Sequence, residues 1–170
     1  FQPKMGSIAK ALDLPAGVEA LGDAGNNFTV ECQWTPRMPF KSSLTGETCQ
    51  QFADEFEKRA GIQWAQYLLH YAVFEVVGDA LKRCADIDDK EAIIEAIGTT
   101  KLDTLAGPVD FTAPIEMGTM RPVKNVYRSP LVSGQWVTGV SDKYTYEFVV
   151  VDNTNYPGIA IDQELKLLEY

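Results

Sequence analysis

Few residues of this chain combine a reactive side chain with the spacing that catalysis or metal binding needs. The single histidine, His70, leaves no second imidazole for a zinc site and few ways to form a Ser–His or Cys–His pair. His70 stands in an apolar stretch, which favours a hydrogen-bonded core position over a ligand contact. The sequence has no G-x-S-x-G elbow, P-loop or G-x-G-x-x-G motif. We therefore expect no catalytic residue, no metal and no cofactor.

Carboxylates gather at one point of the sequence, in Asp86, Asp88 and Asp89. Paired carboxylates can serve as the acid and base of a glycosidase. Acidic residues are also favoured in the first turn of a helix, where they meet the positive end of its dipole. Because a helical pattern starts here, capping and solvation are the expected role.

The cysteines Cys32, Cys49 and Cys84 have no metal-ligand spacing and form no C-x-x-C pair. In an oxidising compartment Cys32 and Cys49 could pair, although the odd count leaves one thiol over. Free cysteine packs as a small apolar residue, so three buried or half-buried thiols are expected and the pairing stays open.

Two further groups of polar residues need partners. Glu75 lies in an apolar surround and should be paired, because an unpaired buried carboxylate is costly. Ser42, Ser43 and Thr45 could form an anion nest before a helix, but turn formation and capping explain them equally well.

The composition suits one domain-sized core, with 170 residues of which 45% are hydrophobic and 23% charged. A net charge of -9 leaves no basic stripe and argues against nucleic acid or an anionic membrane surface as partner. The most apolar stretch, 67–77, falls short of the roughly 20 residues that span a bilayer. The chain opens with Phe1 and no signal peptide, so we expect that an earlier segment was removed.

The pattern along the chain is mixed α and β. Apolar residues 5–9 predict a short buried strand. Pro15 predicts the first turn of a short helix over 15–21. Residues 28–34 alternate with a period of two, as in a half-buried strand that Pro36 ends.

Three helices are predicted in the middle of the chain. The first, over 47–60, carries two phenylalanines on one face and ends at Gly61. The second, over 64–84, is apolar on nearly every side and must pack against more than one neighbour. The third, over 88–97, begins with acidic residues.

The last third is strand-like over 107–111, 126–137 and 144–151. Such apolar strands and an all-round apolar helix need a sheet and facing helices to cover them. Because the chain supplies few strands, we expect part of the fold to come from another polypeptide segment.

Five segments in order resemble the C-terminal half of type I periplasmic substrate-binding proteins, the leucine/isoleucine/valine-binding family in the broad sense. They are residues 34–36 (WTP), 39–46 (PFKSSLTG), 74–83 (FEVVGDALKR), 103–111 (DTLAGPVDF) and 130–136 (PLVSGQW). The resemblance covers nearly all of residues 1–157.

This resemblance implies an α/β fold, a periplasmic-binding-protein-like clamshell of two doubly wound lobes, with only the C-terminal half present. Residues 1–34 would be a second-lobe segment, and 35–125 a mainly helical segment that returns to the first lobe. Residues 126–170 would be crossing strands and a C-terminal second-lobe segment. The missing N-terminal half of the same protein is then an expected partner.

The family binds its solute in the cleft between the lobes. The residues expected to line that cleft are Ser7, Ala9, Trp34, Gln63, Trp64, Gln66 and Tyr67. Aromatic rings there could stack on a flat ligand, although a core position explains Trp64 and Tyr67 equally well.

The residues after the first strand bear on the ligand. Amino-acid binders of the family usually place an acidic residue there to pair with the ligand ammonium. Here Ile8, Ala9 and Lys10 follow Ser7, which favours an organic or aromatic acid over an α-amino acid.

The implied function is that of the extracytoplasmic solute-binding component of an ABC transporter. It would bind a small organic solute, an organic or aromatic acid or an amino acid, and deliver it to a membrane permease. Its location would be periplasmic or otherwise extracytoplasmic. The alternative is a ligand-binding sensory domain of a receptor or regulator with the same fold.

Overall fold

The computed structural model describes residues 1–169, apart from the side chains of Met117 and Met120. The chain divides into two compact units. Unit 1 comprises Phe1–Pro39, Gln50–Leu68 and Pro130–Tyr170, and unit 2 comprises Phe40–Cys49 and Leu69–Ser129.

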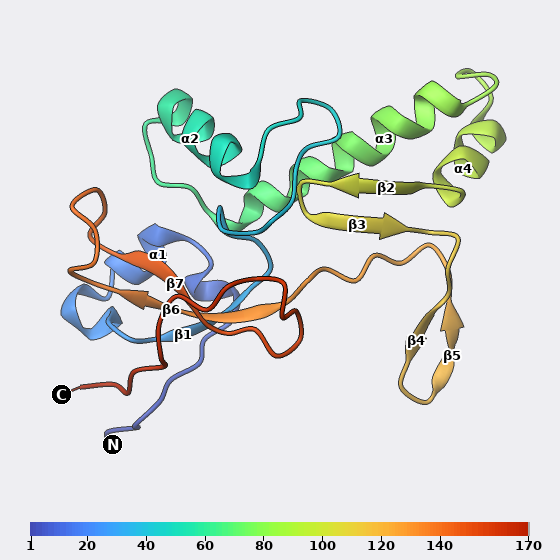
Figure 1. The fold of residues 1–170 in the computed structure, drawn as a ribbon. Coiled ribbons are helices and arrows are strands. Elements are labelled where there is room, and N and C mark those ends of the chain that lie inside the picture. Colours follow the sequence, from blue (N-terminus) through green and yellow to red (C-terminus); the bar gives the residue numbers. More distant parts are fainter. Residues whose placement is uncertain (170) are drawn as a thin grey trace. The chain divides into compact units, whose positions relative to one another are not determined.

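The helices and strands are labelled in Figure 1. The α-helices are α1 (Pro15–Glu19), α2 (Cys49–Ala60), α3 (Tyr71–Arg83) and α4 (Lys90–Gly98). The 3-10 helices are Lys10–Leu12, Gly22–Gly25 and Gln66–His70. The strands are β1 (Thr29–Cys32), β2 (Lys101–Thr104), β3 (Gly107–Asp110), β4 (Ile115–Met117), β5 (Met120–Val123), β6 (Val132–Val137) and β7 (Glu147–Asp152).

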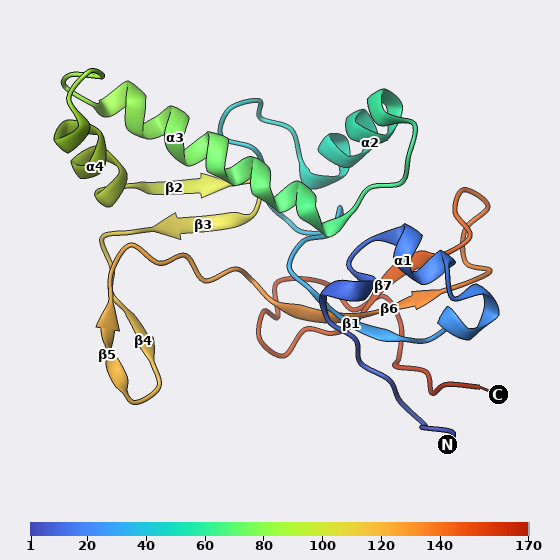
Figure 2. The same cartoon turned by 180° about the vertical axis from the view of Figure 1, so that it is seen from behind.

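Unit 1 is built on an antiparallel sheet in the order β1–β6–β7. The short helices before β1 lie beside this sheet, as both Figure 1 and Figure 2 show. Two long-range hydrogen bonds hold them: Trp136 Nε1 donates to the carbonyl of Leu12 at 2.7 Å, and the Tyr146 hydroxyl donates to the carbonyl of Gly22 at 2.6 Å. The N-terminal and C-terminal segments both belong to this unit.

Four aromatic side chains form the core of unit 1. Phe148 packs edge-on against Trp136, with ring centroids 5.3 Å apart, and against Trp64, at 6.2 Å. Trp64 in turn meets Trp34 edge-on at 5.9 Å. Edge-to-face packing at these distances is favourable beyond the burial of the rings, so this cluster joins β6, β7 and the segment after α2.

Unit 2 contains α3, α4 and two hairpins, β2–β3 and β4–β5. Helix α3 runs along the β2–β3 hairpin, and both α4 and the β4–β5 hairpin lie at the end of that hairpin opposite its turn (Figures 1 and 2). Arg83 fastens the end of α3 to the end of α4. Its Nη2 donates to the carbonyl of Ala96 at 2.7 Å and to Thr100 Oγ1 at 3.0 Å.

A buried carboxylate joins three parts of unit 2. Glu75 on α3 is 0% exposed. It accepts hydrogen bonds from the backbone N–H of Ser43 at 2.6 Å and from that of Leu105 at 2.8 Å. The Ser43 hydroxyl adds a third at 3.1 Å. The prediction that Glu75 is paired is confirmed, because it connects α3 to the loop before α2 and to the β2–β3 turn.

Local chemistry predicted several element ends correctly. Pro15 stands in the first turn of α1. Helix α2 stops at Gly61, whose φ of 69° suits glycine. Asp89 caps α4 by accepting from the N–H of Glu91 at 2.9 Å. The serine and threonine residues of the 40–48 loop form turns, with Ser42 Oγ accepting from the N–H of Leu44 and of Thr45.

Other predicted elements differ from the structure. The long helix over 64–84 starts as a 3-10 helix and becomes α-helical only at Tyr71. Residues 5–9 form one parallel bridge, Ser7 with Thr29, instead of a buried strand. The strand over 126–137 is shortened to β6, and β2, β4 and β5 were not predicted.

Two further expectations concern the burial of His70 and the state of the cysteines. His70 is exposed at the surface, so the predicted core position is wrong. Cys32, Cys49 and Cys84 are all free thiols, and the first two are buried. Burial raises the pKa of the Cys32 thiol and keeps it protonated.

None of the helices in residues 1–169 is long and apolar enough to cross a membrane.

Candidate functional site

All seven residues expected to bind the solute belong to unit 1. Ser7 and Ala9 are exposed, and Ala9 precedes the 3-10 helix Lys10–Leu12. Neither lines the cavity described below, so the structure does not bring them together with the residues that follow α2.

Trp34 and Trp64 are buried against each other in the aromatic core. Their indole rings are surrounded by protein atoms in this arrangement. This packing gives both residues a structural role, and a direct ligand contact stays a prediction.

Gln66 is buried, and its side-chain amide both accepts and donates a hydrogen bond to the backbone near the end of β1. Its Oε1 accepts from the N–H of Gln33 at 2.8 Å, and its Nε2 donates to the carbonyl of Glu31 at 2.9 Å. Because these groups lie at the end of β1, Gln66 holds the residues around Trp34 in place.

Gln63 and Tyr67 are brought together at a cavity of about 610 Å³ in unit 1. Its walls come from the start of α1, from α2 and from the segment between α2 and the 3-10 helix Gln66–His70. The lining residues are Leu14, Pro15, Ala16, Glu19, Phe56, Ile62, Gln63, Ala65, Tyr67 and Leu68. A volume of this size and a mostly apolar lining are typical of small-molecule sites.

Polar groups at this cavity are few. Gln63 Nε2 donates to the carbonyl of Tyr146 at 3.0 Å, while its Oε1 is buried and has no hydrogen-bond partner within residues 1–169. A buried acceptor without a partner is uncommon in folded proteins. The lining also has one carboxylate, Glu19, and no Lys, Arg or His. This set can hold an apolar body and a hydrogen-bond donor or cation.

The wall between Ile62 and Ala65 is anchored by Glu57 of α2. Glu57 Oε1 accepts from the backbone N–H of Trp64 at 2.9 Å and from the Tyr144 hydroxyl at 2.5 Å. Its other oxygen pairs with Lys143. Burial alone would raise the pKa of Glu57, but the bonds from Lys143, Tyr144 and Trp64 outweigh it and hold the pKa below its usual value.

Glu57→Gln should therefore destabilise the protein at pH 7 by about 1–2 kcal/mol, because the amide loses the ion pair and one acceptor. Since the folded pKa of Glu57 lies below its unfolded value, its stabilisation is complete above that unfolded value of about 4.3 and disappears as the pH falls through the folded pKa. Melting curves from pH 7 to pH 3 should show the melting temperatures of wild type and Glu57→Gln converging as the pH falls.

Glu55→Gln on the same helix is the matched control and should change little, because Glu55 pairs with Arg59 at the surface. A constant difference between wild type and Glu57→Gln at all pH values would contradict this account.

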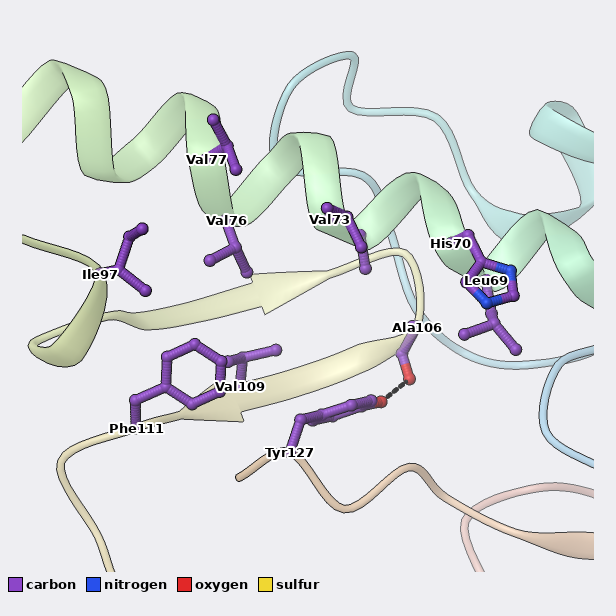
Figure 3. A pocket seen from close by; sticks show the side chains of 11 residues that line it. Leu69, His70, Val73, Val76, Val77, Ile97, Ala106, Val109, Phe111 and Tyr127 are labelled. Atoms are coloured by element: carbon purple, nitrogen blue, oxygen red, sulfur yellow. Dashed lines mark hydrogen bonds between the residues drawn. The ribbon is translucent and has the colours of Figure 1, made fainter. Parts of the chain in front are cut away.

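Unit 2 carries a second concavity, an open groove of about 260 Å³ along α3 (Figure 3). Its lining residues are Leu69, His70, Ala72, Val73, Val76, Val77, Ile97, Ala106, Val109, Phe111 and Tyr127. The Tyr127 hydroxyl donates to the carbonyl of Ala106, which closes one wall. Apart from His70 and the Tyr127 hydroxyl, which is bonded to Ala106, the side chains of the lining are apolar, so the cavity of unit 1 is the better candidate for a solute site.

Sequence reasoning missed most of the cavity wall in unit 1. Phe56 could have been found, because it lies on the apolar face of the helix predicted over 47–60. Glu19 and Ile62 gave no such signal, since each looks like an ordinary surface or turn residue until α1 and α2 are placed. No group of three His, Cys, Asp or Glu side chains within residues 1–169 is arranged to hold a metal ion.

Comparison with known proteins gives a structural likeness and no sequence match. No family model matches the chain, and no curated protein matches it in sequence. Its structure is similar to the crystal structure of a leucine-binding protein, LivK, from Thermotoga maritima, with a TM-score of 0.55 and 17% sequence identity. The likeness covers 88% of this chain and 37% of that one, so the chain spans little more than a third of the neighbour's length. The α/β fold of the chain is thus that of part of a type I periplasmic binding protein.

Proposed function

We propose that this chain is part of the extracytoplasmic solute-binding component of an ABC transporter, which hands a small organic solute to a membrane permease. The likeness to a leucine-binding protein over 88% of the chain is the observation that carries the proposal. The cavity of about 610 Å³ supports it, because it has the size and lining of a small-molecule site.

The cavity lining bears on the class of solute. Glu19 would repel a ligand carboxylate placed beside it and would attract an ammonium, and no cationic side chain lines the cavity to balance an acid. Tyr67, Phe56 and Ile62 supply apolar surface for a side chain or ring. Between an organic acid and an amino acid, this lining favours the solute that carries an ammonium.

A complete binding protein also needs more polypeptide than these residues provide. The likeness covers only 37% of the neighbour, so most of the neighbour's length has no counterpart in these residues. We propose that the remainder of the same protein is the first partner. We also propose that residues 1–34 and 126–170 belong to one lobe and that the chain returns to the other lobe within 35–125, where unit 2 holds Phe40–Cys49 and Leu69–Ser129. The permease is the second partner.

A thermal-shift panel on the full-length product of the gene tests the proposal. The panel contains aliphatic and aromatic α-amino acids, the matching aromatic acids without the amino group, and the matching amines. One class should raise the melting temperature in a saturable way, because a solute at 100 times its Kd stabilises the folded state by about 2.7 kcal/mol. Glycerol serves as the unspecific control. If no class shifts the melting temperature beyond glycerol, the proposal is wrong.

A further inference from the structure

One carboxylate of unit 1 is buried without a partner. Asp13, which follows the 3-10 helix Lys10–Leu12 and precedes α1, is only 4% exposed. Its Oδ1 is buried and has no hydrogen-bond partner within residues 1–169, and none of the ion pairs formed there includes Asp13. Buried polar groups are nearly always hydrogen-bonded, and a buried charge without a partner is costlier still. The surroundings of Asp13 therefore suit a neutral carboxyl better than a charged one.

The titratable side chains that act on Asp13 among the described residues come from β1 and from the 3-10 helix Lys10–Leu12, which packs on β1. Burial raises the pKa of Asp13 most, the like charge of Glu31 raises it further, and Lys10 lowers it. Lys10 is exposed, so water and salt screen its charge. The third group is the thiol of Cys32, which stays protonated. The pKa of Asp13 thus lies above its usual value.

Asp13 stands at the start of one wall of the cavity in unit 1. The next three residues, 14–16, all line that cavity, and Pro15 begins α1. Residues 13–21 lie between two anchors, the carbonyls of Leu12 and Gly22, which are held by hydrogen bonds from the sheet and the segment before β7. A charge on Asp13 would therefore act on the stretch of chain between these anchors, which contains α1.

Helix α1 depends on its packing. It has five residues, and helices of that length are not stable by themselves in water. Val18 fixes it to the rest of unit 1, because its side chain is fully buried. The N–H groups of Gly17, Ala20 and Leu21 close its turns by donating to carbonyls three or four residues earlier, at 2.9, 3.1 and 3.0 Å. Exchange of these three amides reports whether α1 stays packed.

We propose that Asp13 is a pH-sensitive switch for the α1 wall of the cavity. With its carboxyl protonated, Asp13 stays buried and α1 packs on the rest of unit 1. When the proton passes to water, the charged side chain favours solvent and the packing of α1 weakens. A cavity with a loosened wall holds its occupant less tightly, so the solute is released more readily as the pH rises. This last consequence rests on the proposed function, whereas the response of α1 does not.

Hydrogen exchange on the full-length product of the gene tests the switch without any solute. Protection factors, which correct for the intrinsic effect of pH, are measured for the amides of Gly17, Ala20 and Leu21 from pH 4 to pH 8. With rising pH they should fall at least about threefold further in wild type than in Asp13→Asn, which cannot ionise. Asp142→Asn removes an exposed carboxylate of the same unit and should behave as wild type does.

Melting temperatures give a second measurement. Because the pKa of Asp13 is higher in the folded protein than its unfolded value of about 3.9, ionisation lowers the stability as the pH rises through the folded pKa. The melting temperature of Asp13→Asn relative to wild type should therefore increase by about 2–4 °C between pH 4 and pH 8. In Glu31→Gln the like charge is gone, so the same increase should be smaller and should be complete at a lower pH.

Either measurement can overturn the proposal. A melting-temperature difference between Asp13→Asn and wild type that is the same at pH 4 and pH 8 does so, and so do protection factors that change equally in the two proteins. If Asp13→Asn does not fold, the pH dependence of α1 protection in wild type and in Glu31→Gln is compared instead, and identical profiles contradict the switch. A solute panel without any stabilising compound would sink the proposed function and leave these results unaffected.

Discussion

Replacing Glu75 by alanine is expected to lower the free energy of unfolding by about 4 kcal/mol. The substitution removes a fully buried carboxylate and leaves the backbone N–H groups of Ser43 and Leu105 without their acceptor. Each buried donor left unsatisfied costs about 1–3 kcal/mol, and the space vacated by the side chain adds a cavity term.

The measurement is chemical unfolding followed by two signals. All three tryptophans belong to unit 1, so their fluorescence reports that unit, whereas α3 and α4 of unit 2 contribute to the far-ultraviolet circular dichroism. Glu75→Ala should shift the circular-dichroism midpoint more than the fluorescence midpoint.

Glu75→Gln is the matched control and should lose less, because its amide oxygen keeps one acceptor. A Glu75→Ala protein within about 1 kcal/mol of wild type would show that Glu75 does not hold unit 2 together.

A second large effect is expected at Gly134 of β6. A Cβ atom added there would lie 1.9 Å from Cζ and 2.5 Å from Cε1 of Phe148. Phe148 cannot move aside, since it is buried between Trp64 and Trp136 in the aromatic core. Gly134→Ala should therefore destabilise unit 1 by about 3 kcal/mol or more, at the upper end of the range for overpacked cores.

Tryptophan fluorescence during unfolding reports this effect, because Trp64 and Trp136 pack against the Phe148 ring that must shift. Gly158→Ala in the same unit is the control, since its Cβ would approach only the Tyr156 ring, at 3.2 Å. A Gly134→Ala midpoint equal to that of Gly158→Ala would mean that the core of unit 1 is looser than its aromatic contacts indicate.

The parts of the fold that follow from local chemistry could be read from the sequence. Proline fixes the start of α1, a glycine with positive φ ends α2, and an aspartate caps α4, and each of these acts within a few residues. The strands β2, β4 and β5 were missed because they are three or four residues long and exist only through their partners. The same limit explains the short stretch 66–70, where the periodicity expected of an α-helix belongs to a 3-10 helix.

The candidate site, like the fold, could be predicted from the sequence only in part. Gln63 and Tyr67 were expected to face a ligand and do line the cavity of unit 1. Trp34 and Trp64 were equally plausible by type, but only the placement of β7 shows that Phe148 and the two indoles fill one another's space. Glu19 could not be identified, because it becomes part of the wall only when α1 approaches α2.

Isothermal titration calorimetry of the full-length protein with the solute that stabilises it most tests the central claim most directly. The account predicts one site per molecule and an affinity at least tenfold weaker in Tyr67→Ala, while Tyr156→Ala, away from the cavity, binds as wild type does. Unchanged affinity in Tyr67→Ala, or no measurable heat with any of the amino acids, acids or amines, would contradict it.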